Sequence, residues 1–478
     1  MCAVVGVHGT PDAAIWVRRA LSALQHRGQE SAGIAVADGS DIRVFKQVGL
    51  VSQALPESEI LKLNGSIAIG HVRYSTAGKN RIEEAQPLLT ECYHGMIAVV
   101  HNGNLIDQRG LKREVLMMNG TFQTTSDTEI ALQMYAQTNK KTLDERLKRI
   151  GERMKAAFAM LFLTENQLAI LQDPYGFRPL MIGQIGSATV IASESCAFTQ
   201  LEQMSGQEAD CIRDVLPGEI ITVGQDGIKA TSWMDIPRQR QRCIFEHVYF
   251  SRPDSITFGH RVQKVRRKLG QLLADVSKIN ADIVVPIPNS GIHAGIGYAE
   301  ASGIPIEWAL VRNQYIGRTF IDPLQSHRDN GVVEKLLPIV HLIEDKRVVL
   351  VDDSIVRGTT TRKIVRMVRE VGKAREVHVA ISCPLTISSC FYGIDTPRRE
   401  ELIASRMNVE EIRAQIGADS LTYNTLENLF AAVSPFAQEY CTSCYTNAHP
   451  LLDKFNLHTD NGYPERRHDG IQPHPTQG

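Results

Sequence analysis

The stretch VVLVDDSIVRGTTTRKIVRMV, residues Val348–Val368, decides the fold of the second half of this chain. Four apolar residues that favour β structure come first, and two acidic residues and a loop rich in glycine, serine and threonine follow them. The spacing of Ile364, Val365 and Val368 then gives one apolar face of a helix. The stretch therefore predicts a buried strand, a polar loop and a helix.

The polar loop in this stretch suits a phosphorylated ligand. Backbone N–H groups and hydroxyls at the start of a helix can bind a phosphate. The adjacent carboxylates of Asp352 and Asp353 suit ribose hydroxyls or a hard cation such as Mg²⁺. An ordinary strand–turn–helix with a capping Asp is the alternative, but so specific a run favours the phosphate site.

Helical patterns and apolar strands alternate on both sides of this stretch. The other strand-like runs of the second half are ADIVVPIP and EVHVAIS, so we expect a parallel α/β sheet there. The first half has helical patterns around Ala14–Gln25 and Asp127–Gln137. It is otherwise rich in short strand-like runs, namely AVVGV, SAGIAV, SIAIG, MIAVV, FAMLFL, LAIL, ATVIAS and EIITV.

The chain is too long for one ordinary hydrophobic core, since it has 478 residues. We expect a first domain over residues 2–231 and a second over residues 243–452. The polar, basic run SWMDIPRQRQR at residues 232–242 is the expected linker. Residues 453–478 are polar and without periodicity, and this composition predicts a disordered tail.

The composition excludes several classes of protein. Lys and Arg together number 52 against 53 Asp and Glu, so charge gives no case for nucleic acid or a membrane surface as partner. No apolar run approaches the roughly 20 residues that span a bilayer, and the N-terminus lacks signal-peptide features. We therefore expect a cytoplasmic protein. The nine cysteines, an odd number, are expected to be thiols or metal ligands rather than a disulfide framework.

The N-terminal run MCAVVGV places Cys2 where removal of Met1 makes it the first residue. A thiol has an ordinary pKa of about 8.5 and needs a base near neutral pH, and an α-amino group with a pKa of about 7.7–8.0 can serve. Cys2 would then hold nucleophile and base in one residue. The alternative is that Cys2 merely begins a buried strand.

Three further segments carry side chains that suit an amide substrate. Arg73 in HVRYSTAG has a guanidinium that can hold a carboxylate in two hydrogen bonds. Asn102-Gly103 in VHNGNL reads as a hairpin turn, and also as an amide beside an exposed N–H that can form an oxyanion hole. TTSDTE looks like a helix N-cap, with Asp127 near the start of the helix.

The segments MCAVVGVHG, LQHRGQESAGIA, HVRYSTAG, VHNGNL and TTSDTE, in that order, resemble the glutaminase domain of class II glutamine amidotransferases. That family belongs to the N-terminal nucleophile hydrolases, which have a four-layer αββα fold. The resemblance implies that Cys2 attacks the glutamine side-chain amide and releases ammonia. It also implies that Arg73 holds the α-carboxylate, Asp127 the α-ammonium, and Asn102 and Gly103 the tetrahedral oxyanion.

DDSIVRGTT resembles the phosphoribosyl pyrophosphate (PRPP) motif of type I phosphoribosyltransferases, which have an α/β fold. The resemblance implies that Asp352 and Asp353 contact the ribose and its Mg²⁺. It also implies that Ser290, in VPIPNSGIHAGIGYA, joins the metal site, and that RNQYIGRTF at 312–320 begins a loop that closes over PRPP. The remaining implied PRPP contacts are Ser354, Arg357, Gly358, Thr359 and Thr360.

A glutaminase followed by a PRPP site resembles the amidophosphoribosyltransferase family. The resemblance implies that ammonia from glutamine is channelled to PRPP and displaces pyrophosphate to give 5-phosphoribosylamine, the first step of purine synthesis. It further implies a homotetramer with one Mg²⁺ per subunit and feedback inhibition by purine nucleotides. Glutamine and PRPP are the expected substrates.

Cys441-Thr-Ser-Cys444 is a C-x-x-C pair that alone could be a redox motif, half a zinc site or chance. With the distant Cys243 and Cys390 it makes four thiolates, which suit zinc or an iron–sulfur cluster equally well on ligand count. The resemblance implies the 4Fe–4S cluster of the iron–sulfur subgroup of the family. The remaining cysteines are expected to be plain buried thiols, namely Cys92, Cys196, Cys211 and Cys383.

The second half departs from the family pattern at Asn289, where relatives usually have Asp, at Ile292-His293, and at Glu334 and Leu337. These departures leave two alternatives open, a paralogue with an altered acceptor or specialised pathway and a non-catalytic PRPP-sensing protein. The grouping of glutaminase residues argues against a mere sensor. DDSIVRGTT argues against the amidotransferases that make glucosamine phosphate or asparagine.

Overall fold

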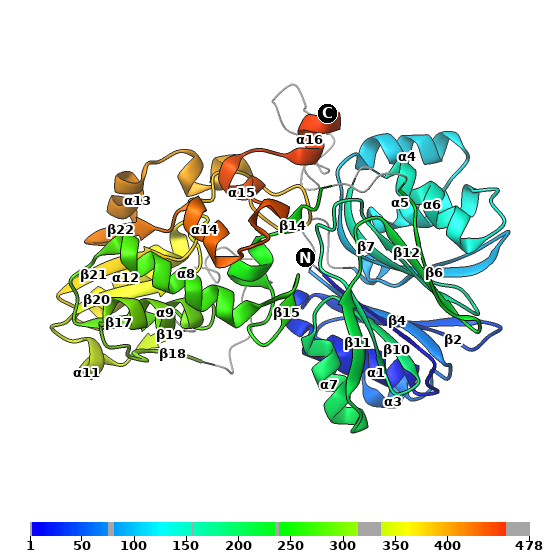
Figure 1. Ribbon diagram of the computed structural model, residues 1–478, viewed down its shortest axis with the longest axis horizontal. Helices are drawn as coiled ribbons and strands as arrows, with labels where there is room; N and C mark the ends of the chain where they lie inside the picture. The colour runs from blue at the N-terminus through cyan, green and yellow to red at the C-terminus, as the bar shows by residue number, and fades with distance from the viewer. Residues whose placement is uncertain (1, 75–80, 155, 235–238, 314–335, 456–478) are drawn as a thin grey trace, which may run out of the picture.

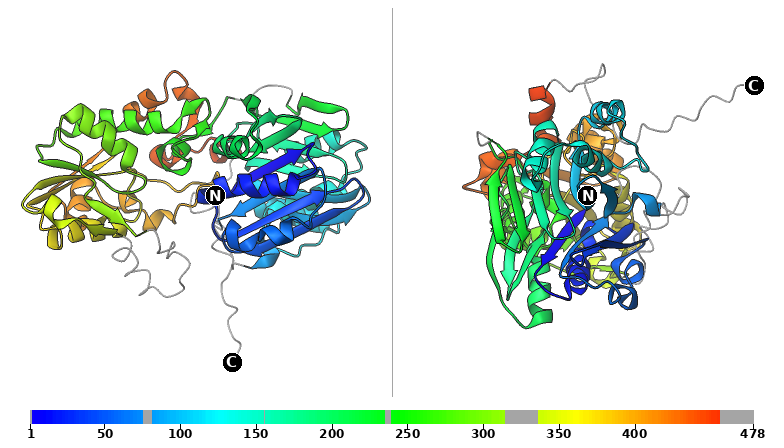
Figure 2. Two further views of the ribbon diagram at one scale, coloured as in Figure 1. Left: turned by 90° about the horizontal axis from the view of Figure 1, so that it is seen from below. Right: turned by 90° about the vertical axis from the view of Figure 1, so that its right-hand side faces the viewer.

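The computed structural model describes residues 2–74, 81–154, 156–234, 239–313 and 336–455. Figure 1 shows two domains side by side, the first coloured blue to green and the second green to red, and the left view of Figure 2 shows the same arrangement. The expected closing loop lies almost wholly outside the described residues, as do Glu334 and most of the expected tail. The described part of the chain holds no helix with the length and apolar character needed to cross a bilayer.

Two antiparallel sheets form the centre of the first domain. One has the strand order β11-β9-β10-β1-β4-β2-β3 and the other has the order β13-β12-β8-β7-β6-β5. The strands of the first sheet are β1 (Ala3–His8), β2 (Ser31–Ala37), β3 (Ile42–Val48), β4 (Ile67–Arg73), β9 (Met181–Ile185), β10 (Ala188–Ala192) and β11 (Ala209–Asp214). Those of the second are β5 (Leu88–Cys92), β6 (Gly95–Leu105), β7 (Ala156–Leu163), β8 (Leu168–Gln172), β12 (Glu219–Gly224) and β13 (Gly227–Ser232).

The two sheets pack face to face between two layers of helices. Alternate residues of a strand point to opposite faces, so Val4 lies in the core between the sheets and Ala3 and Val5 lie against helices. One outer layer consists of α1 (Ala13–Ala23), η1 (Gln25–Arg27), α2 (Val51–Ala54), α3 (Glu57–Ile60) and α7 (Cys196–Ser205). The other consists of α4 (Gln108–Met117), α5 (Thr128–Gln137) and α6 (Leu143–Arg153), with η2 (Ile82–Glu84) nearby. This is the predicted four-layer αββα fold.

A four-stranded parallel sheet of order β17-β20-β21-β22 forms the centre of the second domain. Its strands are β17 (Ile283–Pro286), β20 (Arg347–Asp352), β21 (Glu376–Ile381) and β22 (Ser420–Tyr423). The helices around it are α8 (Val262–Ser277), α9 (Ile292–Ser302), α11 (Val340–Ile343), α12 (Thr359–Glu370), α13 (Val409–Ile416), α14 (Leu426–Ala432), α15 (Ser443–Thr446) and α16 (Pro450–Phe455). The predicted α/β fold is confirmed, and the opening stretch forms β20, the polar loop and α12.

Short elements connect the two domains and surround the parallel sheet. They are β14 (Arg242–Cys243), η3 (Glu246–Phe250), β15 (Ile256–Thr257), β16 (His260–Arg261), β18 (Leu310–Arg312), β19 (Leu336–Pro338), η5 (Arg399–Glu401), η6 (Ile403–Ser405), η7 (Ala437–Glu439) and β23 (Tyr440–Cys441). Of these, η3 is a π-helical turn. The domain boundaries expected from composition stay predictions.

Candidate active sites

Cys2 lies immediately before β1 at the end of the first sheet, next to the last residues of β4. Its backbone N–H donates to Oδ1 of Asn102 at 3.4 Å, and its carbonyl accepts from Nε of Arg27 at 3.1 Å. Burial raises the pKa of the thiol, but the charge of His71 and a hydrogen bond to it outweigh burial, so this pKa lies well below its ordinary value. The thiol is therefore prepared to act as a nucleophile.

Asn102 and Gly103 lie inside β6, opposite Ala159 and Phe158 of β7, so the predicted hairpin turn at this pair is wrong. The strand continues because Gly103 adopts a φ of +155°, and a Cβ there would lie 2.0 Å from the carbonyl oxygen of Ala157. The Asn102 side chain is fully buried, and its Nδ2 has no hydrogen-bond partner among the described residues. A buried amide donor beside Cys2 suits an oxyanion.

Arg73 is the last residue of β4 and is buried. Its Nη1 has no hydrogen-bond partner among the described residues, and its Nη2 is 3.7 Å from Oε2 of Glu84. The other oxygen of Glu84 accepts from the N–H and the hydroxyl of Thr125, each at 2.8 Å. Glu84 thus ties Arg73 to the loop that carries Asp127.

Asp127 stands at the N-cap position of α5, so the predicted helix start is confirmed, but its side chain makes no capping hydrogen bond. The residue already has helical dihedral angles, and its Oδ2 accepts instead from the N–H of Leu105 at 3.0 Å. Its Oδ1 is 3.7 Å from Nδ1 of His101. These contacts fix a buried carboxylate near the end of β6, two residues beyond Gly103.

Asp352 and Asp353 stand at the carboxyl end of β20, where parallel sheets commonly bind ligands. Ser290 donates to Oδ1 of Asp352 at 3.1 Å, and Ser354 donates to Oδ2 of Asp353 at 2.6 Å. Burial and the charge of Asp353 raise the pKa of Asp352 well above its ordinary value. Two such buried acids would be stabilised by a cation.

Gly358 begins the turn into α12 with a φ of +78°, and a Cβ there would lie 2.7 Å from Cδ1 of Ile403. Thr359 and Thr360 form the first turn of this helix, where their N–H groups and hydroxyls are accessible. The Arg357 side chain lies away from the loop, because its Nε and Nη2 donate to Oε2 of Glu401 at 3.0 and 2.6 Å. Only the backbone of Arg357 belongs to the loop.

The four cysteines of the expected cluster lie within electrostatic reach of one another. Cys243 and Cys441 are register partners in the parallel pair β14–β23. Burial raises the pKa of Cys444, and the charges of Cys243, Cys390 and Cys441 add to the rise. Among the described residues, no group of three or more His, Cys, Asp or Glu side chains is arranged to hold a metal ion.

The remaining cysteines differ in burial. Cys196 and Cys383 are buried, as expected, but Cys92 is half-buried and Cys211 is exposed, so the prediction for these two is wrong. Cys211 lies in the edge strand β11, which has solvent on one side.

Sequence reasoning missed several residues that contact the proposed site residues. His71 and Arg27 belong to segments that carry the family resemblance, but no role follows from their local pattern. Glu84 and Glu246 bind these segments from far along the chain. These four residues can be identified only from the contacts that they make in the folded structure.

Comparison with known proteins agrees with this geometry. Residues 71–200 match the glutamine amidotransferase domain family, and residues 256–403 match the phosphoribosyl transferase domain family. The chain is 44% identical to an amidophosphoribosyltransferase of Glycine max, covering 94% of this chain and 78% of that protein. It is also 44% identical to the amidophosphoribosyltransferase of Bacillus subtilis, covering 94% of each.

A solved structure of the Bacillus subtilis glutamine PRPP amidotransferase, complexed with ADP and GMP, superposes with a TM-score of 0.87 at 43% identity. The match covers 94% of this chain and 97% of that one. Sequence, domain content and fold thus agree over nearly the whole length, and the chain belongs to the amidophosphoribosyltransferase family.

Proposed function

We propose that this chain hydrolyses glutamine at Cys2 and uses the ammonia to displace pyrophosphate from PRPP, giving 5-phosphoribosylamine, the first step of purine synthesis. The observation that carries the proposal is that Cys2, whose thiol has a lowered pKa, bonds through its backbone N–H to Asn102, whose buried Nδ2 has no hydrogen-bond partner among the described residues. A structural cysteine would need neither feature. Membership of the family supports the acceptor half of the reaction.

In the first half-reaction, the sulfur of Cys2 forms a bond to the amide carbon of glutamine, and the carbonyl oxygen takes the electron pair. The Nδ2 of Asn102 and the N–H of Gly103 stabilise that oxyanion. The α-amino group of Cys2, which took the thiol proton, gives it to the leaving nitrogen as the C–N bond breaks, and ammonia departs. Water hydrolyses the thioester to glutamate and frees Cys2.

The proposed contacts with the two substrates use charged and hydroxyl-bearing side chains of both domains. Arg73 offers Nη1 to the α-carboxylate of glutamine, since only its Nη2 faces Glu84. Asp127 offers negative charge to the α-ammonium group. In the second domain, Ser290, Asp352 and Asp353 would hold the ribose of PRPP with one Mg²⁺, which would neutralise the pyrophosphate that leaves.

The 5′-phosphate of PRPP is proposed to lie at the N-terminus of α12. The backbone of Arg357 and Gly358, the N–H of Ser354, and the N–H and hydroxyl groups of Thr359 and Thr360 supply donors where the helix dipole favours an anion. Gly358 adopts a left-handed conformation at the turn into the helix, which its lack of a Cβ allows.

The test is glutamate release from glutamine by anaerobically purified protein, with and without PRPP and Mg²⁺. We expect PRPP to stimulate release strongly and Cys2→Ala to abolish it, while phosphoribosylamine formation from ammonia persists in the variant. Unchanged glutamine-dependent activity in Cys2→Ala would rule out the nucleophile. Glutamate release indifferent to PRPP would instead favour a paralogue with another acceptor, and the departures at Asn289 and Leu337 would explain it.

We also propose that Cys243, Cys390, Cys441 and Cys444 bind a 4Fe–4S cluster with a structural role. The electrostatic interactions among the four thiols support this. Hydrogen-bonding groups near the sulfurs also support it, because the N–H of Tyr392 is 3.3 Å from the sulfur of Cys390 and the hydroxyl of Ser443 is 3.1 Å from that of Cys441. Because the four do not form an ion site as they stand, cluster binding must draw the sulfurs into place. Iron and sulfide in equal amounts, lost in Cys390→Ser, is the expected result; zinc in their place would contradict the cluster.

Three expectations about regulation and context stay proposals. Purine nucleotides are the proposed feedback inhibitors, which the ADP and GMP in the Bacillus subtilis structure support. A homotetramer and a cytoplasmic location follow from family resemblance and composition. Sedimentation of the purified protein and its response to ADP and GMP test the first two.

A further inference from the structure

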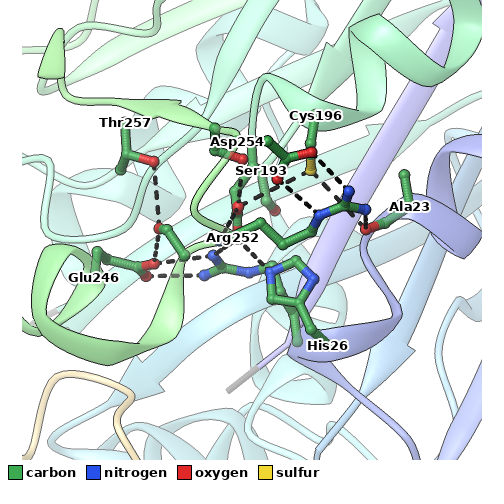
Figure 3. A network of polar contacts seen from close by, with 12 residues as sticks. Ala23, His26, Ser193, Cys196, Glu246, Arg252, Asp254 and Thr257 are labelled. Carbon is green, nitrogen blue, oxygen red and sulfur yellow. Dashed lines mark hydrogen bonds and ion pairs between the residues drawn. The ribbon is translucent and has the colours of Figure 1, made fainter. Parts of the chain in front are cut away.

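A network of buried charges joins the two domains (Figure 3). Figure 3 shows Arg252 of the second domain donating to the carbonyl of Ala23 of the first, with Glu246 of the second domain nearby. At the centre of the network lies Arg27, whose side chain is fully buried. A buried guanidinium is stable only when acids and carbonyls satisfy it, so the partners of Arg27 determine where it lies.

The guanidinium of Arg27 binds both domains and the backbone of the nucleophile. Its Nη1 and Nη2 donate to the two carboxylate oxygens of Glu246 at 2.9 and 2.8 Å, a bidentate pair across the domain interface. Nη1 also donates to Glu194 of the first domain, and Nε donates to the carbonyl oxygen of Cys2 at 3.1 Å. One rigid fork therefore connects the carbonyl of Cys2 to an acid of the second domain.

Several donors in addition to Arg27 hold the carboxylate of Glu246. The hydroxyl of Ser251 donates to Oε2 at 2.6 Å, and Arg178 of the first domain donates to Oε1. Glu246 starts the π-helical turn η3, whose backbone is bound in turn by Arg266 of α8 through the carbonyls of His247 and Ser251 at 2.8 and 2.7 Å. The acid is therefore a fixed part of the second domain.

The interface is reciprocal, because Glu194 of the first domain accepts from the second. The N–H of Arg252 and the hydroxyl of Ser255 donate to Oε2 of Glu194 at 2.9 and 2.7 Å. Each domain thus supplies an acid to donors of the other. Both acids have lowered pKa values despite burial, because the neighbouring cations stabilise their charged forms.

We propose that Glu246 is a positioning residue for Cys2 and acts through Arg27. This inference rests on the proposed function. Once Met1 is removed, no peptide bond precedes Cys2, so its orientation depends on β1, on the hydrogen bond from its nitrogen to Oδ1 of Asn102, and on the hydrogen bond that its own carbonyl accepts. Arg27 supplies that bond, and Glu246 holds Arg27 in two hydrogen bonds. The second domain thereby completes the nucleophile site of the first.

The test compares Glu246→Gln with Ser195→Ala as a matched control. Ser195 accepts a hydrogen bond from the N–H of Ile256 at 2.7 Å, so the control also removes a contact between the domains, but one that does not involve Arg27. We expect Glu246→Gln to lower kcat for glutamine by about 10- to 100-fold with KM changed less than about threefold. The ammonia-dependent reaction, which bypasses Cys2, should stay within about twofold in both variants.

A second readout separates positioning from thiol reactivity. A diazoketone analogue of glutamine should inactivate Glu246→Gln about tenfold more slowly than the unmodified protein, because this reaction needs an oriented nucleophile. Alkylation of Cys2 by iodoacetamide, which needs little orientation, should change less than about threefold. If Glu246→Gln folds poorly, Glu246→Asp and Ser251→Ala can replace it, because both keep the charge of residue 246. In these variants the glutamine and diazoketone reactions should again fall more than the ammonia and iodoacetamide reactions, but by smaller factors.

Each outcome is decisive. An unmodified protein that neither hydrolyses glutamine nor reacts with its analogue contradicts the proposed function. An active protein whose Glu246→Gln variant matches Ser195→Ala overturns the inference alone. A parallel fall of the glutamine- and ammonia-dependent reactions also overturns it, since that result indicates a purely structural role.

Discussion

The buried amide of Asn102 is the residue whose chemistry depends most on its place in a strand. Its Oδ1 accepts from the N–H of Cys2, and its buried Nδ2 has no hydrogen-bond partner among the described residues. An unpaired buried donor is costly, and a developing oxyanion would satisfy it. In the proposed reaction, the amide would therefore gain a partner only in the transition state.

Asn102→Ala should lower kcat for glutamine by about 10²- to 10³-fold with little change in KM, because the lost contact belongs to the transition state. Steady-state glutamate release measures this. Asn104→Ala is the matched control, since Asn104 lies two residues along β6 and its amide donates instead to the carbonyl of Phe391 at 2.8 Å. Equal losses in the two variants would contradict the assignment of Asn102.

His71 makes a prediction about pH. Burial alone would raise the pKa of the Cys2 thiol, and the charge and hydrogen bond of His71 bring it below its ordinary value. In His71→Asn the burial persists and the stabilisation of the thiolate is lost, so the pKa rises. The pH profile of Cys2 alkylation, followed on the N-terminal peptide, should move to higher pH.

His94→Asn is the control for this experiment. His94 also donates to a backbone carbonyl, that of Thr138 at 2.7 Å, but it has no contact with Cys2. If the pH profile of His71→Asn coincides with that of the control, His71 does not lower the pKa of the Cys2 thiol.

At the scale of elements, the sequence predicted the central strands except β9 and missed most of the edge strands. β1, β7 and β20 are uninterrupted apolar runs because both of their faces are covered. β11 and β13 stand at sheet edges with mostly exposed residues, so they lack the apolar pattern on which prediction depends. β22, also an edge strand, was missed for the same reason.

The proposed site residues were predictable where they lie within a short segment that resembles a family motif. Residues that act through contacts between distant parts of the sequence were not predictable. Cys2, Arg73 and Asp127 lie in recognisable segments. The strand conformation of Asn102 and Gly103 was not predictable, because Asn-Gly usually marks a turn. Arg27 and Glu246 are 219 residues apart, and no local pattern joins them.

The loop after Cys390 is an element of the second domain that packs on β6. Gly393 has a φ of +108°, and a Cβ there would lie 3.2 Å from Cα of Gly103. Gly393→Ala should therefore push the loop away from the proposed oxyanion hole. We expect a lower kcat for glutamine and a free energy of unfolding lower by about 1–3 kcal/mol, which thermal unfolding and glutamate release measure.

Gly206→Ala separates backbone strain from this contact. Gly206 has a φ of +69° and a Cβ there would meet nothing within 4 Å, so this variant carries the strain alone. It should lose stability and keep its kcat. If Gly393→Ala also keeps its kcat, the loop does not support the oxyanion hole.

At the scale of the whole molecule, one line of contacts runs from the proposed PRPP acids to the nucleophile. Arg266 lies within electrostatic reach of Asp353 and binds the backbone of η3, where Glu246 begins. Glu246 binds Arg27, and Arg27 binds the carbonyl of Cys2. If PRPP and Mg²⁺ bind at Asp353 as proposed, they change the charge that Arg266 faces, and this line of contacts would carry the change toward Cys2.

Continuity of contacts does not by itself establish coupling, so the prediction concerns the PRPP stimulation of glutamate release. Arg266→Lys keeps the charge but cannot donate to both carbonyls that Arg266 binds at η3. It should reduce the stimulation severalfold, while glutamate release without PRPP changes little. Arg267→Lys, the neighbour that binds Glu300 on the surface, is the control. If the two residues act along one line, Arg266→Lys should reduce stimulation much less in a Glu246→Gln background. Additive effects of the two substitutions would instead mean that the PRPP signal reaches Cys2 by another route.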